Sequence, residues 1–311
     1  MIKIMYHSPV LLDETIESLE INENGVYVDL TFGGGGHSKE ILKRLSSKGK
    51  LIAFDSDNDA EDNHIDDPRF IFLRQNFIYL MQNLNFLKIN GVDGILADLG
   101  VSSHQFDDKE RGFSFVGNYN LDMRMDRYQE IDAVEILNNY DEKKLANVFY
   151  KNGDLNNSRK ISDLICKYRK KNKIKSSNQL NESLEPLLCK GYENKFLARV
   201  YQSLRIEVNN EINYLKKLLT QIPSILNKNG IAAIITYHSI EDRLVKRFFN
   251  NGCFENEPIK DDFGNKKIVF QTKKFVTPSE SELKKNSSPV TCISDNFSLS
   301  QITKFASTCA A

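Results

Sequence analysis

The sequence has no net charge and no clustered cysteines, and each of these absences argues against certain kinds of protein. Its 311 residues hold 42 Lys and Arg against 42 Asp and Glu, so the formal net charge is zero. This disfavours a protein that coats nucleic acid by bulk charge, although a local basic patch remains compatible with nucleic-acid binding. The five cysteines are scattered, at 166, 189, 253, 292 and 309. Such spacing excludes zinc and redox motifs and is typical of a reducing cytosol.

Long apolar runs are missing as well. No stretch reaches the roughly 18 consecutive apolar residues that suggest a membrane-spanning helix. The opening segment, "MIKIMYHSPVLLDETIESLE", contains neither the apolar core nor the cleavage site of a signal peptide. We therefore expect a cytoplasmic protein without a membrane partner.

Two familiar motifs are also absent. The glycines at 33–36 do not fit G-x-G-x-x-G, because Ser38 takes the third place when Gly33 and Gly35 form the pair. A diphosphate cofactor, and with it a nicotinamide-dependent reductase, is therefore less favoured. No G-x-S-x-G occurs either, so the dipeptide His238-Ser239 does not indicate a hydrolase.

The first hundred residues instead alternate short apolar runs with helical patterns. Buried strands are predicted at 26–30, 50–55, 69–74 and 93–100, and helical spacing occurs at 38–45 and 77–87. This order predicts the α/β class, with a doubly wound parallel sheet that has helices on both faces. The carboxyl ends of its strands then share one edge, where such sheets bind ligands.

The pattern changes after this region and later returns. Residues 98–128 show neither a strand nor a helix period, which suggests a functional segment because their apolar content argues against disorder. Residues 130–220 are mostly helical. Asn229-Gly230 is expected to end a helix, followed by a strand at 231–237, a helix at 240–249 and strand material at 266–278. We therefore expect a sheet domain in two parts, 1–107 and 215–311, with a helical domain inserted at 108–214.

The segment "TFGGGGHS" joins the first predicted strand to the first predicted helix. Glycines in such a turn let a ligand approach the backbone closely, and the helix start supplies free N–H groups. A tight turn without a ligand is the alternative, although a bare turn rarely needs more than one or two glycines.

Carboxylates end the second and fourth predicted strands. Asp55 is placed to accept hydrogen bonds from a ribose diol, which NAD and S-adenosylmethionine share. Asp98 would face whatever reacts with the cofactor, and its alternative role is to cap the following turn. Asp55 by itself would be an ordinary exposed aspartate; the glycine turn beside it favours the ribose role.

Several segments together closely resemble one family. "HSPVLLDETIESL", "VDLTFGGGGHS", "DGILADLGVSSHQFDDKERGFSF", "LDMRMD", "LRIEVNNEI" and "YHSIEDRLVKRF" are similar to the MraW-type methyltransferases, over about residues 6 to 286. The resemblance implies a class I S-adenosylmethionine-dependent methyltransferase (a Rossmann-like sheet) with an inserted helical, RNA-recognising domain. It also implies methylation of the exocyclic N(4) amine of a cytidine in the decoding region of 16S ribosomal RNA, within the small ribosomal subunit.

The resemblance assigns cofactor-binding residues for S-adenosyl-L-methionine. Together with Gly33 of the turn, they are Gly35, Gly36, His37, Asp55, Phe77, Asp98 and Gln105. Phe77 would pack on the adenine side of the pocket, or else serve as a core aromatic.

Catalysis requires the cytosine amine to lose conjugation with the ring and to shed a proton. A hydrogen-bond acceptor favours both, so Asp98 is the first candidate and His238 the second. No cysteine adjoins the motifs, which disfavours covalent attack on the pyrimidine ring and favours an amine acceptor.

Substrate contacts are expected from several polar side chains: Asp122, Arg124, Arg205, Ser239 and Arg243. For Arg205, an ion pair with Glu207 or Glu211 is the alternative. Phe113 and Phe115 are expected either to stack on a displaced base or to fill the seam between domains. The stretch 159–175, "RKISDLICKYRKKNKIK", is expected either to bind RNA phosphates or to be a solvated helix face.

The tail departs from the family. Its members usually carry an Arg-rich "NPRARS"-like segment, whereas residues 286–296 read "NSSPVTCISDN" without arginine. This leaves one alternative to an enzyme, namely an RNA-binding ribosome-assembly factor that keeps the cofactor pocket but has lost turnover. DNA, protein and small molecules remain alternative acceptors, and the sequence leaves the choice between a monomer and a homodimer open.

Overall fold

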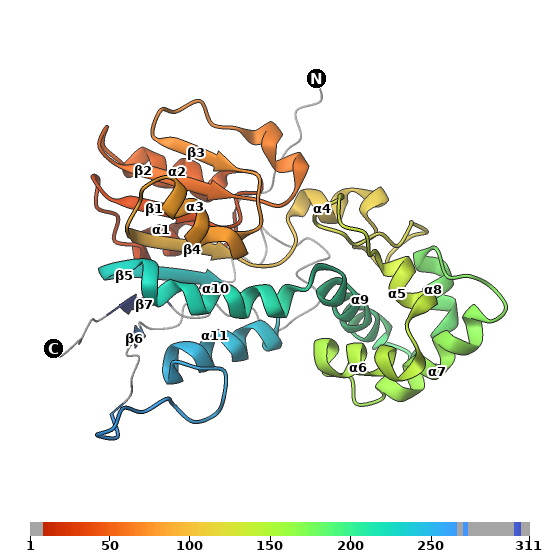
Figure 1. Ribbon diagram of the computed structural model, residues 1–311. Helices are drawn as coiled ribbons and strands as arrows, with labels where there is room; N and C mark the ends of the chain where they lie inside the picture. Colours follow the sequence, from red (N-terminus) through yellow and green to blue (C-terminus); the bar gives the residue numbers. More distant parts are fainter. Residues whose placement is uncertain (1–8, 266–269, 273–301, 306–311) are drawn as a thin grey trace. The chain divides into compact units, whose positions relative to one another are not determined.

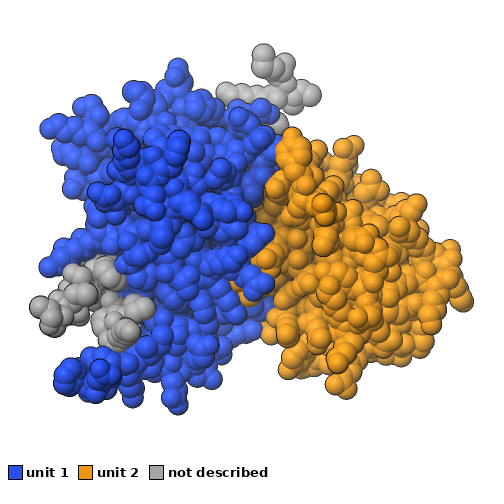
Figure 2. All heavy atoms as spheres, viewed as in Figure 1, with its two compact units in different colours: residues 1–100, 213–287, 294–311 blue, residues 101–212, 288–293 orange. Residues whose placement is uncertain are grey.

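The computed structural model describes residues 9–265, 270–272 and 302–305, and these residues form two compact units (Figures 1 and 2). Unit 1 contains the described residues up to Gly100 and from Asn213 onward, and unit 2 runs from Val101 to Ile212. The unit limits thus fall after residues 100 and 212, whereas the sequence analysis expects domain boundaries after residues 107 and 214. Of the expected strand material at 266–278, only residues 270–272 are described. The arginine-free segment 286–296 lies outside the described residues.

Unit 1 is built on a seven-stranded sheet with the order β3-β2-β1-β4-β5-β7-β6. Strands β1 to β5 are parallel, while β7 pairs antiparallel with both β5 and β6. The strands are β1 (Val26–Asp29), β2 (Lys50–Phe54), β3 (Phe70–Leu73), β4 (Val92–Asp98), β5 (Leu226–Ile235), β6 (Phe270–Thr272) and β7 (Ile302–Phe305). The parallel α/β sheet predicted from the sequence is confirmed.

Helices cover both faces of this sheet (Figure 1). One face packs against α1 (Leu12–Ser18) and α2 (Gly36–Arg44). The other packs against α3 (Leu80–Phe86), α10 (Glu211–Ile225) and α11 (Ser239–Asn251). Alternate residues of each strand point to opposite faces, so Ile95 and Ala97 join one core while Leu96 joins the other. Because both faces are buried, the strands are continuous apolar runs.

Strand β5 differs from its prediction. It begins at Leu226, directly after α10, and not at 231. Asn229 has a left-handed backbone (φ 65°), and the pairing with β4 shifts between Val92 and Gly94. Asn229-Gly230 therefore forms an irregularity inside the strand and does not end the helix, so that expectation is wrong.

Unit 2 is helical. Its helices are α4 (Ser103–Asp107), α5 (Ala133–Asn139), α6 (Glu142–Gly153), α7 (Ser158–Arg169), α8 (Ser177–Ser183) and α9 (Glu193–Asn209), and α10 begins at its C-terminal limit. Helix α9 ends where Asn210 adopts a left-handed conformation (φ 52°), which divides the long apolar repeat seen in the sequence into two helices. No helix in the described part of the chain is long and apolar enough to span a membrane.

The segment without a regular period is fixed by side chains of its own unit. The Arg111 guanidinium is buried and donates hydrogen bonds to the carbonyl oxygens of Arg124 and Met125, each at 3.0 Å. Phe113 and Phe115 lie in the core of unit 2, where both are more than nine-tenths buried. These rings therefore pack within unit 2, and of the two alternatives left open by the sequence, stacking on a base stays a prediction.

Candidate active site

Polar side chains gather at the carboxyl ends of four neighbouring strands of unit 1. Asp29 ends β1, Asp55 follows β2, Asp98 ends β4 and Tyr237 follows β5. These strands are consecutive in the sheet, in the order β2-β1-β4-β5. The parallel arrangement thus brings three acids and a phenol from distant parts of the sequence to one edge, the usual ligand-binding edge of such a sheet.

The glycine turn above this edge requires glycine at several positions for different reasons. Gly33 (φ 49°) and Gly35 (φ 72°) have left-handed backbone conformations, which residues other than glycine rarely adopt. A Cβ at Gly35 would lie 2.8 Å from the Phe32 ring, and a Cβ at Gly36 would lie 2.1 Å from the Pro9 ring. The run of glycines therefore makes a tight turn that also lies close to its neighbours.

Two of the acids hold this turn in place. Asp55 Oδ2 accepts a hydrogen bond from the Gly33 N–H at 2.7 Å, and its Oδ1 accepts one from the Asp57 N–H at 2.8 Å. Asp29 Oδ2 accepts a hydrogen bond from the Ser38 hydroxyl at 2.6 Å. Because a carboxylate has about four lone-pair positions, Asp55 keeps acceptor capacity for a ligand hydroxyl while it orders the turn.

Asp98 is held by the strand next to its own. The Tyr237 hydroxyl donates to Asp98 Oδ1 at 2.7 Å, and the Asp98 N–H donates to the Thr31 hydroxyl at 2.7 Å. Gly100 (φ 108°) lets the chain turn beneath the tyrosine, since a Cβ there would lie 3.2 Å from the ring. Among the described residues, no hydrogen bond to Asp98 Oδ2 is present, so this oxygen remains an available acceptor.

The three acids have raised pKa values. Burial raises the pKa of Asp29 and of Asp55 to about 6, and that of Asp98 to about 7. The negative charges of Asp29 and Glu241 raise the pKa of Asp98 further, whereas the Tyr237 hydrogen bond lowers it. Neighbouring carboxylates also raise the pKa of Asp55, so the edge would favour a positively charged ligand.

His37 lies in the first turn of α2 with an unusual environment. It is 6% exposed, and its Nε2 has no hydrogen-bond partner among the described residues. Burial lowers the pKa of His37 to about 4, against a hydrogen bond to the Val10 backbone that raises it. The imidazole is therefore neutral at ordinary pH, with an unsatisfied buried nitrogen beside the glycine turn.

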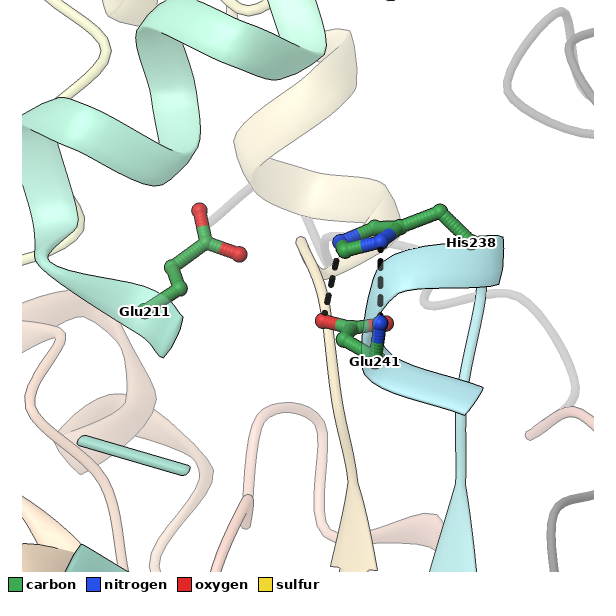
Figure 3. Close-up of side chains that lie close together, drawn as sticks. All are labelled: Glu211, His238 and Glu241. Atoms are coloured by element: carbon green, nitrogen blue, oxygen red, sulfur yellow. Dashed lines mark hydrogen bonds and ion pairs between the residues drawn. The ribbon is translucent and has the colours of Figure 1, made fainter. Parts of the chain in front are cut away.

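His238 begins α11 as its N-cap. Its Nδ1 accepts a hydrogen bond from the Glu241 N–H at 3.3 Å, and its Nε2 lies 3.2 Å from Glu241 Oε1 (Figure 3). Glu241 Oε2 accepts a hydrogen bond from the Tyr237 N–H at 3.0 Å. His238 therefore has a structural role as the cap of the helix, and Glu241 holds the Tyr237 backbone. Ser239 and Arg243, both expected to contact substrate, are exposed on the first turns of this helix.

Two expected cofactor residues have local structural partners. Phe77 begins η2 (Phe77–Tyr79) and packs, partly buried, against the core beneath the sheet. Gln105 belongs to unit 2, where its Oε1 accepts a hydrogen bond from the Ser102 N–H at 3.0 Å in the capping box of α4. The two residues lie in different units, and their assignment as cofactor ligands stays a prediction.

The expected substrate residues of unit 2 form ion pairs within that unit. Arg124 grips Asp122 through two hydrogen bonds, at 2.7 and 2.8 Å. Arg205 makes the same kind of pair with Glu211, at 2.8 and 2.9 Å. An ion pair with this residue is one of the alternatives that the sequence analysis gives for Arg205. The Asp122–Arg124 pair orders the "LDMRMD" segment, and a direct substrate role for these side chains stays a prediction.

Sequence reasoning missed the role of Tyr237. It lies in the quoted segment "YHSIEDR", directly after a strand that pairs with the strand of Asp98, so strand order would have indicated the contact. Asp29 and Thr31 were missed as partners of the turn and of Asp98 because their side-chain contacts depend on the local path of the chain. Nothing in the spacing of those two residues signals the contacts.

Comparison with known proteins gives consistent matches along the chain. The model of the MraW methylase family matches residues 4–292. A Christiangramia forsetii protein named Ribosomal RNA small subunit methyltransferase H is 50% identical over 287 residues, which cover 92% of this chain and 95% of that protein. Proteins of the same name from Flavobacterium johnsoniae and Bacteroides fragilis are 48% and 47% identical, and each alignment covers 90% of this chain and 93% of the relative.

Proposed function

Because the chain belongs to the MraW methylase family, it is a methyltransferase, and we propose that it methylates the N(4) amine of a cytidine in 16S ribosomal RNA. The methyl donor in this proposal is S-adenosyl-L-methionine, and the substrate is the decoding region within the small ribosomal subunit, in the cytoplasm. The names of the relatives support a ribosomal RNA substrate. The resemblance noted in the sequence supports the cytidine amine.

The acidic edge of the sheet is the observation that carries the choice of cofactor. Burial raises the pKa values of Asp29, Asp55 and Asp98, and neighbouring carboxylates raise those of Asp55 and Asp98 further. S-adenosylmethionine is a sulfonium cation, so its binding would relieve the unfavourable charge of this edge. A neutral or anionic cofactor would gain no such stabilisation.

The residues present fit this cofactor. Asp55 would accept hydrogen bonds from the ribose hydroxyls, and it already fixes the glycine turn at this edge by accepting the Gly33 N–H. The buried Nε2 of His37, which has no partner among the described residues, is one polar atom that a bound ligand would satisfy. When bound, the cofactor supplies a methyl group activated by the positive sulfur.

Asp98 is the proposed acceptor of the proton from the cytosine amine. Its pKa of about 7 is close to the value that suits a general base at neutral pH. One carboxylate oxygen is fixed by Tyr237, which orients the other for the substrate. His238 is the weaker candidate, because its Nδ1 already accepts the Glu241 N–H and its ring is buried.

The alternative of an assembly factor without turnover rests on the arginine-free segment 286–296, which lies outside the described residues. The experiment that separates the two is transfer of labelled methyl from S-adenosylmethionine to small subunits, naked 16S RNA, DNA and free cytidine. We expect transfer to the ribosomal acceptors only. Cofactor binding without transfer to any acceptor would favour the assembly factor.

The affinity for S-adenosylmethionine is expected to rise with pH. The free protein takes up protons on the edge acids as the pH falls through about 7 and 6, and a bound cation opposes this protonation. We therefore expect the ratio of the affinities for S-adenosylmethionine and for its neutral-sulfur product, S-adenosylhomocysteine, to fall by about tenfold from pH ~8 to pH ~5.5.

Calorimetric titration with both compounds at the two pH values measures this ratio. The product serves as the control because it differs only in lacking the transferred methyl group and, with it, the positive charge on the sulfur. An unchanged ratio would contradict a charge interaction between the acids and the sulfonium.

A further inference from the structure

We propose that the loop 170–175 of unit 2, here called the lysine loop, binds the phosphate backbone of the RNA substrate. It follows helix α7 and reads "KKNKIK", with lysines at 170, 171, 173 and 175. All four lysines are exposed. The inference rests on the proposed ribosomal RNA substrate and specifies where unit 2 would hold it.

The lysines of the basic stretch 159–175 differ in whether they have an acidic partner. On α7, Lys160 and Lys167 both pair with Asp163, at 3.6 and 2.8 Å. Within the described residues, none of the four lysines of the loop has a carboxylate within 4.0 Å. On α7, Arg159 and Arg169 have no carboxylate partner among the described residues either, and Arg169 donates to the Leu137 carbonyl. Unpaired positive charge therefore continues from the helix into the loop, where all four lysines carry it.

Stabilisation of the C-terminus of α7 explains only some of the lysines in this loop. Cations stabilise the negative end of a helix, but the effect is confined to about the last turn. Lys170 is the C-cap of α7 and Lys171 donates its N–H to the Tyr168 carbonyl, so both can act in this way. Lys173 and Lys175 lie beyond that turn, and helix capping does not account for them.

The loop has a fixed backbone, which suits it to bind a ligand. Ile174 is fully buried, and its N–H and carbonyl both bond to the Asn138 amide of α5, at 3.0 and 2.7 Å. The Lys175 N–H donates to Gln179 Oε1 at 2.8 Å, and its carbonyl accepts from the Leu121 N–H at 3.1 Å. Lys173 and Lys175 thus flank an anchored residue, so binding would order only their side chains.

The contact with Leu121 also connects the loop to the "LDMRMD" segment, which begins at that residue. The side chains point to a polyanion as the partner, because exposed lysines bind phosphates as point charges without requiring a shaped pocket. RNA is the polyanion that the proposed substrate supplies.

The test compares two variants with equal loss of charge. One is the loop variant K173Q/K175Q, and the other is the helix variant K160Q/K167Q, whose lysines are paired with Asp163. Binding to naked 16S RNA is measured by filter retention between about 50 and 200 mM salt. The slope of log affinity against log salt is expected to become shallower by about 1.4 to 1.8 in the loop variant. We expect a much smaller change in the helix variant.

Charge-preserving and folding controls complete the test. K173R/K175R should keep the wild-type slope, and all variants should melt within a few degrees of the wild type. Wild-type slope in the loop variant would overturn the proposal. The proposal would also be overturned if the loop variant bound naked RNA normally but bound whole subunits weakly, because this would indicate a protein partner. Because binding is measured without methyl transfer, the result is independent of whether the proposed activity is found.

Discussion

Replacing Asp98 by Asn is expected to lower kcat for methyl transfer to small subunits by about 10²- to 10⁴-fold, the usual contribution of a general base. Asparagine has nearly the same shape, and its carbonyl oxygen can still accept the Tyr237 hydroxyl. It cannot take up a proton, so the amine would have no partner to which it could lose one. Single-turnover kinetics with saturating cofactor measure this step directly.

The variant Tyr237→Phe gives the matched control for Asp98. It keeps the carboxylate and removes only the hydrogen bond that lowers its pKa. The pKa of Asp98 should then rise, and the acidic limb of the pH profile of kcat/KM should move to higher pH. A purely structural tyrosine would change the rate without moving this limb. Near wild-type turnover of the Asp98→Asn protein, with normal cofactor binding, would exclude Asp98 from the mechanism.

Replacing Gly35 by Ala is expected to weaken binding of S-adenosylmethionine by about tenfold, the effect of losing about 1.4 kcal/mol of contacts with the turn. The new Cβ would lie 2.8 Å from the Phe32 ring, in a left-handed backbone that alanine adopts poorly. Either the turn that Asp55 holds or the buried Phe32 ring must therefore shift. Titration calorimetry measures the affinity.

Gly191→Ala in unit 2 is the control for this substitution. Gly191 also has a left-handed backbone (φ 85°), but a Cβ there meets nothing within 4 Å. It therefore reproduces the backbone strain without the clash and should leave cofactor affinity unchanged. Equal effects of the two substitutions on binding would show that general destabilisation, and not the geometry of the turn, explains the loss.

The sheet was predictable because its signals are local. Both faces are covered, so β1 to β4 are apolar runs whose limits the sequence locates within one or two residues. The acids Asp55 and Asp98 could be found because a parallel sheet places every strand end at one edge. The start of β5 was missed because Asn229-Gly230 has the composition of a helix end, whereas the pairing with β4 accommodates it as an irregularity.

The side-chain partners could not be predicted in the same way. The sequence around Arg205 suits either a substrate contact or an ion pair with Glu207 or Glu211, and it did not indicate the pair of Arg124 with Asp122. Only the fold of unit 2 brings Arg205 to Glu211, six positions along the chain and beyond the end of α9. Likewise, the bond between Tyr237 and Asp98 links residues 139 positions apart. Such contacts depend on tertiary packing, which the residue pattern does not specify.

We propose that this methyltransferase modifies the exocyclic amine of a cytidine in small-subunit RNA. The most direct test uses small subunits from cells that lack the protein, incubated with the purified chain and S-adenosylmethionine. The RNA is then digested, and the modified nucleoside is identified by mass spectrometry. We expect cytidine with one added methyl group on N(4), absent when the Asp98→Asn variant is used. A methyl group on a ring carbon, on a ribose oxygen or on another base would contradict it.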